Sequence, residues 1–168
     1  RELWRVPRQE IDTWATPLNP IPSPVYHDGI AILMSGFQGN DLRAVRLSEA
    51  KGNIDGSNAV AWSLVRDTPY VPSPLLYDNV LYFLKTNTGV LSAFDPKTGT
   101  PHYQTQRLDG VPEVFSSPVG AAGRVYITGR DGTTLVLRHG PTYQVLATNT
   151  LNDGFDASPA LVDREMFL

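Results

Sequence analysis

The sequence contains no cysteine, which excludes structural disulfides and metal sites built from thiolates. It also has little excess of either charge, because 14 Lys and Arg face 17 Asp and Glu for a net charge of −3. That balance excludes the strongly basic surface expected of a nucleic-acid-binding protein. No apolar run approaches the ~20 residues of a membrane-spanning helix. No segment shows sustained helical periodicity, so these absences favour an all-β protein that neither spans a membrane nor binds nucleic acid.

Turn-forming residues are abundant, with 14 Gly and 14 Pro. Such a composition is typical of many short strands joined by tight turns. The dipeptide Ser-Pro occurs four times, and successive copies are 50, 44 and 41 residues apart: Ser23-Pro24, Ser73-Pro74, Ser117-Pro118 and Ser158-Pro159. These intervals match the repeat length of β-propeller blades, roughly 40 to 50 residues.

Each Ser-Pro starts the same pattern. A turn residue follows the proline by five positions in all four copies: Gly29, Asn79, Gly123 and Arg164. A large apolar residue follows three positions later: Ile32, Tyr82, Tyr126 and Phe167. The second copy predicts short strands near residues 75–77, 80–84, 90–94 and 101–105, with 80–84 apolar throughout, as for a strand buried on both faces. We therefore predict an all-β fold, a β-propeller of four-stranded antiparallel blades, with about four blades present; the alternative is a β-sandwich with coincidental repeats.

The repeat divides the chain into one partial propeller over residues 1–168. The predicted pieces are the end of a blade at 1–20, blades at 21–66, 71–108 and 115–150, and the start of a blade at 156–168. The two end pieces could close a four-blade ring, the chain could belong to a larger ring, or two copies could form one eight-blade ring. We expect a partial or half propeller whose open blade edges favour self-association.

Residues 93–99 (Ala-Phe-Asp-Pro-Lys-Thr-Gly) resemble the Ala-x-Asp-x-x-Thr-Gly motif of quinoprotein-type, PQQ-like propeller repeats. In that family a Trp usually follows the Gly by four residues and docks between neighbouring blades. Tyr103 stands at that position here, Trp62 follows an insertion in the first copy, and Trp4 fits the docking position of the incomplete first blade. The third copy has no docking aromatic unless Tyr143 serves. The resemblance implies a structural role for the repeat motif Ala93, Asp95, Thr98, Gly99 and Tyr103.

The resemblance implies two functions. The family includes periplasmic scaffolds that help to assemble the outer membrane, which implies a bacterial periplasmic or extracellular protein. We therefore expect a non-catalytic binding or assembly platform without a cofactor, whose partner is another protein or an envelope component. The alternative is a dehydrogenase of alcohols or sugars that uses pyrroloquinoline quinone (PQQ) and Ca²⁺, or a fragment of one. Such enzymes commonly carry adjacent disulfide-bonded cysteines, which this chain lacks, and the carboxylates of Asp131, Asp153 and Asp156 fit turns better than a Ca²⁺ site.

No residue pattern indicates catalysis or metal binding. The serines before the prolines recur in every copy, whereas a nucleophile would occur once, and His27, His102 and His139 lack metal-ligand spacing. A ligand site is expected where the segments before each Ser-Pro meet around the axis, because those segments enter the innermost strands. The predicted central contacts are Tyr70, Glu113, Phe115 and Asp156; the alternative is that they only line the channel.

Overall fold

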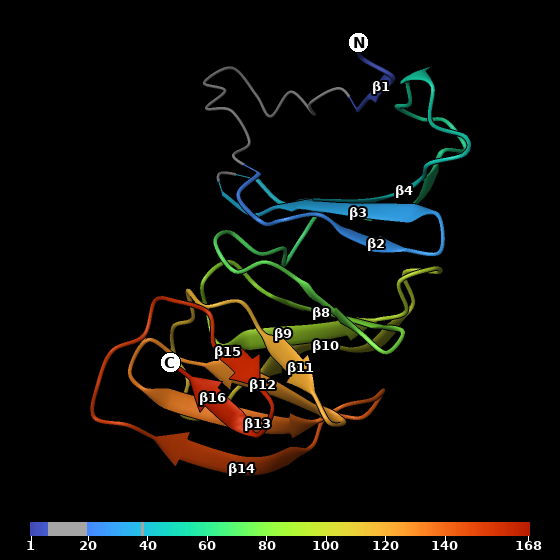
Figure 1. Cartoon of the computed structure of the whole chain (residues 1–168). Coiled ribbons are helices and arrows are strands. Elements are labelled where there is room, and N and C mark those ends of the chain that lie inside the picture. Colours follow the sequence, from blue (N-terminus) through green and yellow to red (C-terminus); the bar gives the residue numbers. More distant parts are fainter. Residues whose placement is uncertain (7–19, 38) are drawn as a thin grey trace.

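The computed structural model describes residues 1–6, 20–37 and 39–168, and these residues form strands, turns and loops without a helix. Three sheets each contain four antiparallel strands that follow one another along the chain (Figure 1). Blade 1 comprises β2 (Val25–His27), β3 (Ile30–Ser35), β4 (Asp41–Arg46) and β6 (Val60–Leu64). Blade 2 comprises β7 (Leu75–Tyr77), β8 (Val80–Leu84), β9 (Val90–Phe94) and β10 (Pro101–Arg107). Blade 3 comprises β11 (Val119–Ala121), β12 (Arg124–Thr128), β13 (Thr133–Arg138) and β14 (Val145–Thr150).

A hairpin follows blade 3, formed by β15 (Ala160–Val162) and β16 (Glu165–Phe167). The innermost strands β2, β7, β11 and β15 lie beside one another in that order, so the sheets stack face to face around one edge (Figure 1). This arrangement confirms the predicted fold class, an open run of β-propeller blades.

The first strand lies far from the last hairpin (Figure 1). β1 (Trp4–Arg5) pairs in parallel with β5 (Gly52–Asn53), which lies inside the enlarged third turn of blade 1. Trp4 packs there against a small buried cluster that includes Ala50 and Ile54. Because β1 and the β15–β16 hairpin belong to different sheets, the described residues do not form a four-blade ring closed by the two ends.

The repeated serines form a ladder of hydrogen bonds across the blades. The backbone N–H of Ser23 donates to Ser73 Oγ at 2.9 Å, and that of Ser73 donates to Ser117 Oγ at 3.0 Å. Ser117 N–H in turn donates to Ser158 Oγ at 2.8 Å. Each hydroxyl thus satisfies a backbone donor at the start of the preceding blade, where no strand partner is present. The periodicity of the serines therefore has a structural cause.

Two apolar cores join the three blades. Because side chains alternate between the two faces of a strand, β8 supplies both cores. Leu81 and Phe83 face blade 1 and pack with residues such as Ile32, whereas Tyr82 and Leu84 face blade 3. All five residues of β8 are buried, as the apolar run predicted.

Hydrogen bonds from backbone N–H groups to a side chain hold the turn after β9. Asp95 Oδ1 accepts hydrogen bonds from the N–H groups of Lys97 and Thr98 at 2.8 and 2.9 Å. Burial raises the pKa of Asp95, but these hydrogen bonds and the nearby His102 outweigh burial, so the pKa lies below its ordinary value. Gly99 ends the turn at φ +71°, and the indole of Trp62 in blade 1 lies directly against it. Trp62 Nε1 donates to the carbonyl of Pro96 at 3.0 Å, so this aromatic ties blade 1 to blade 2.

Candidate functional site

The segments before Ser73, Ser117 and Ser158 pack against a turn of the preceding blade. In blade 2 the turn between β8 and β9 contains Gly89, where an added Cβ would lie 1.6 Å from the carbonyl oxygen of Val111. Gly89 N–H donates to Pro112 O at 3.1 Å, and Val114 N–H donates to Asn87 O at 2.8 Å. Only glycine permits this approach, so the loops at the axial end of the blades are fixed by backbone contacts.

Three of the four predicted contact residues meet around one arginine. Arg130 lies in the turn between β12 and β13, and its Nε is 2.9 Å from Asp156 Oδ1. Its Nη1 donates to Glu113 Oε2 at 3.4 Å, and its guanidinium lies 4.8 Å from the ring centre of Phe115. We call Arg130, Glu113, Phe115 and Asp156 the axial cluster.

The axial cluster is open to solvent. The side chains of Arg130, Glu113 and Asp156 are about half exposed, at 49%, 48% and 62%. The hydrogen bond that Arg130 donates to Glu113, followed by the charge of Asp156, raises the pKa of Arg130 above its ordinary value, so the guanidinium stays charged. With two carboxylates and one guanidinium, the cluster offers hydrogen-bond donors, acceptors and an aromatic ring at one place.

Tyr70, the fourth predicted residue, lies elsewhere along the same loops. Its ring stacks on Phe37, with centroids 4.6 Å apart and planes inclined by 20°. Sequence reasoning missed both Phe37 and Arg130, because they belong to the turns after the second strands rather than to the segments before Ser-Pro. Their position in the repeat, at the same end of the blades, is the signal that could have identified them.

The described residues do not fit the Ca²⁺ that the alternative function requires. Ca²⁺ takes six to eight oxygen ligands, whereas a fixed guanidinium already lies between the carboxylates of Glu113 and Asp156. Asp131 accepts from the N–H and hydroxyl of Thr133, and Asp153 accepts from Gly154 N–H, so both carboxylates hold turns. Over residues 1–6, 20–37 and 39–168, no three His, Cys, Asp or Glu side chains are grouped to hold a metal ion.

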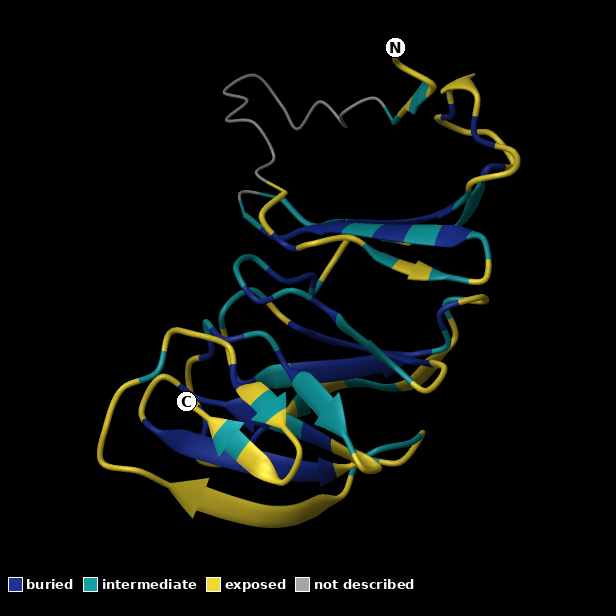
Figure 2. Cartoon of the chain, in the orientation of Figure 1, coloured by how far each residue is buried: buried dark blue, intermediate teal, exposed yellow. Residues whose placement is uncertain are grey.

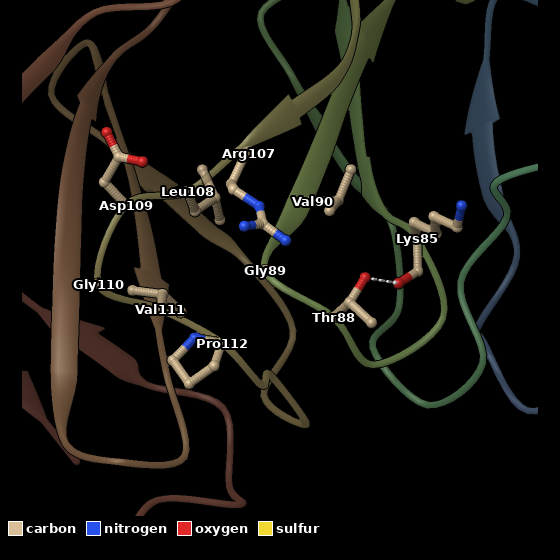
Figure 3. A pocket seen from close by; sticks show the side chains of 10 residues that line it. All are labelled: Lys85, Thr88, Gly89, Val90, Arg107, Leu108, Asp109, Gly110, Val111 and Pro112. Carbon is tan, nitrogen blue, oxygen red and sulfur yellow. Dashed lines mark hydrogen bonds between the residues drawn. The ribbon is translucent and has the colours of Figure 1, made fainter.

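One hollow lies outside the axial cluster, and its lining ends at Pro112, the residue before Glu113. It has a volume of about 560 Å³ and lies between the outer end of blade 2 and the connection to blade 3 (Figure 3). Arg107, Asp109 and Lys85 supply its charged side chains. Lys85 Nζ pairs with Asp67 at 2.9 Å, and Thr88 Oγ1 donates to the carbonyl of Lys85 at 2.6 Å.

The second hollow, of about 320 Å³, lies on blade 1 beside a buried arginine. Arg43 is 7% exposed, and its Nε lies 3.1 Å from Asp41 Oδ1. Its Nη1 lies 3.2 Å from Asp55 Oδ1, in the enlarged turn of the blade. A buried guanidinium needs such partners, so we assign these carboxylates a structural role.

His139, one of the three histidines considered in the sequence as metal ligands, joins blades 2 and 3. Its Nδ1 lies 3.0 Å from the hydroxyl of Tyr82, which also accepts from Gly140 N–H at 2.9 Å. The ring of His139 packs edge-on against Tyr77, with centroids 4.8 Å apart. These contacts give the histidine an inter-blade role in place of a metal-binding one.

Several solved propeller structures resemble this chain. A computationally designed protein, Ika4, matches with a TM-score of 0.64 at 14% identity, over 99% of this chain and 89% of that one. A europium-containing methanol dehydrogenase matches with a TM-score of 0.56 at 14% identity, over 76% of this chain and 24% of that one. The quinohemoprotein alcohol dehydrogenase from Comamonas testosteroni gives 0.55 at 14% identity, over 79% and 21%.

These likenesses show the propeller fold, and at such identities they show the fold alone. The chain spans about a quarter of the methanol dehydrogenase that it resembles. Neither a protein-family model nor a curated protein sequence matches the chain. Among the described residues there is no helix of the length and hydropathy needed to cross a membrane.

Proposed function

We propose that this protein is a non-catalytic propeller platform that binds another protein or an envelope component through the axial cluster. The observation that carries the proposal is the gathering of Arg130, Phe115, Glu113 and Asp156 on loops held by backbone hydrogen bonds. Arginine and aromatic side chains dominate the binding energy of protein interfaces. Loops that are already ordered lose little conformational entropy on binding, which favours affinity.

The proposal includes a periplasmic or extracellular setting and no cofactor. The proposed setting rests on the resemblance of residues 93–99 to the PQQ-like repeat and on the propeller fold. The second candidate, a quinoprotein dehydrogenase or a fragment of one, is favoured by the fold shared with the methanol and alcohol dehydrogenases. The position of Arg130 between the carboxylates supports the platform over this candidate.

The platform is tested with peptides selected from a displayed random library against the whole chain. We expect Arg130→Ala to weaken the selected peptides by about tenfold or more, as for other interface hot spots. The matched control is Arg124→Ala, at the start of β12 and so at the far end of that strand from the turn that holds Arg130, which should leave the affinity unchanged. Peptides that bind both variants as well as the parent chain would contradict the axial site.

The second candidate is tested separately by titrating PQQ with Ca²⁺ while recording tryptophan fluorescence. Saturable binding together with dye-linked oxidation of methanol or glucose would replace the platform by the enzyme. No quenching and no oxidation are expected.

A further inference from the structure

The outermost strand of blade 3 has the most exposed edge of the three blades. All six residues of β14 are exposed, including Val145 and Leu146 at 41% each. The strand forms a uniformly exposed ribbon at the edge of the fold (Figure 2). Its sequence, Val-Leu-Ala-Thr-Asn-Thr, has no charge and no proline, and its valine and two threonines are residues that favour strands.

The outermost strands of the other blades are protected against pairing. β10 begins at Pro101 and ends at Arg107, and its ladder with β9 has two irregularities. In β6, four of the five residues are only partly exposed, and Trp62 packs onto blade 2. Charge, proline and bulges are the usual means by which natural proteins block edge strands.

β14 has no charge and no proline, and the one irregularity in its ladder with β13 lies between Val145 and Ala147. Its register with β13 is continuous from Ala147, opposite Val136, to Thr150, opposite Thr133. Ala147 stands where Trp62 and Tyr103 stand in blades 1 and 2, as shown by their partners Ala44 and Ala93. Blade 3 therefore lacks the large side chain that would fasten its outer strand to a neighbour.

The free backbone groups of this edge can be assigned. Leu151 N–H donates inward to Gly132 O at 3.1 Å. Because inward and outward groups alternate along an antiparallel strand, Ala147 and Asn149 also face β13. The N–H and C=O groups of Thr148 and Thr150 therefore point away from the sheet.

We propose that β14 pairs in antiparallel fashion with β14 of a second copy of this chain, joining two blades into one eight-stranded sheet. The two-fold axis passes at Thr148, so that Thr148 faces its own symmetry mate and Leu146 faces Thr150. A strand without charge can meet its own copy because no like charges become opposed, and Thr–Thr pairs are favourable across strands. A two-fold contact of this kind closes on itself and leaves the axial cluster free.

The test is sedimentation velocity of the whole chain over a concentration series up to about 1 mM, the range of weak association. The parent chain should dimerise as concentration rises. Thr148→Lys places two like charges at the two-fold axis, and so does Thr148→Glu, so each variant alone should dimerise at least tenfold more weakly. Mixing the two variants should restore the dimer, because opposite charges then face each other.

The matched control is His102→Lys, which adds the same charge to the exposed outer strand of blade 2 and should not affect dimerisation. In the dimer, hydrogen exchange of the Thr148 and Thr150 amides should slow, whereas that of the Ala147 amide should not change. Circular dichroism establishes that each variant is folded. A parent chain that stays monomeric throughout overturns the proposal, and so does association that the Thr148 variants leave intact.

Discussion

The interface between blades 1 and 2 and the interface between blades 2 and 3 both pack aromatic side chains, but their chemistry differs. Between blades 1 and 2 the contact is mainly apolar: Phe83 and Phe94 lie 5.2 Å apart, and Trp62 stacks beside Phe94 with centroids 6.2 Å apart. One indole N–H requires a partner, and Pro96 supplies it. The stability of this interface therefore depends on the apolar area that it buries and on how closely the side chains fit.

Between blades 2 and 3 the aromatic contacts involve tyrosines and His139. Tyr82 bonds with Gly140 and lies next to His139, while Tyr77 accepts from Gly123 N–H at 2.9 Å. Tyr103 meets Tyr143 edge to face at 5.8 Å. Buried hydroxyls stabilise only while they remain neutral and hydrogen-bonded, so this interface depends on protonation as well as on area.

Trp62 in blade 1 and Tyr103 in blade 2 occupy the same docking position between blades. The identity of the aromatic residue at that position sets how the contact between blades responds to pH. A Trp at this position makes the contact insensitive to pH, whereas a Tyr makes it sensitive to alkali. An Ala, as at residue 147 of blade 3, leaves the outer strand unfastened.

The largest expected effect is at the apolar interface. Trp62→Ala removes a half-buried indole and its hydrogen bond, and should lower the free energy of unfolding by about 2–4 kcal/mol. Urea unfolding followed by circular dichroism measures the change. Tyr26→Ala removes an aromatic residue that is 63% exposed on the same blade and should cost far less. Equal losses in the two variants would show that the indole does not join the blades.

Alkaline pH should weaken the tyrosine interface alone. Burial raises the pKa values of Tyr103, Tyr82 and Tyr143 above the ordinary value. Their contribution to stability is therefore complete below the unfolded pKa of about 10 and is lost as pH rises towards the raised folded pKa values.

For Tyr103 the expected loss is about 1 kcal/mol between pH 9 and 11. Tyr103→Phe removes the ionisable group and should flatten the dependence of unfolding free energy on pH over that range. Urea unfolding at each pH measures it. A slope that the substitution does not change would place the titration elsewhere in the chain.

The smallest effect concerns an exposed ion pair across the first interface. Lys97 Nζ lies 2.7 Å from Asp28 Oδ2, and the pair lowers the pKa of Asp28 and raises that of Lys97. Because both side chains are in solvent, Lys97→Met should shift the melting temperature only slightly, and salt should remove the difference. The contribution should also vanish as pH falls through the lowered pKa of Asp28. A large shift that persists in high salt would contradict a screened surface pair.

Sequence periodicity predicted the blades because each one depends on local features. The apolar alternation of β8 and the turn chemistry of Asp95 and Gly99 act within a few residues of each other. The composition of the axial cluster was predicted only in part. Glu113, Phe115 and Asp156 follow from their place before Ser-Pro, whereas Arg130 joins them through a different turn of the neighbouring blade.

The sequence by itself determined the repeat, the strand order and the residues that dock between blades, since these follow from spacing, turn propensity and side-chain volume. Only the tertiary structure decided which turns meet at the axis, where Trp4 packs, and which outer strand remains exposed. Those facts depend on contacts between residues many tens of positions apart, such as Ser23 with Ser73 and Tyr82 with His139. Such contacts are set by the angle at which one blade packs on the next, and no local pattern in the sequence encodes that angle.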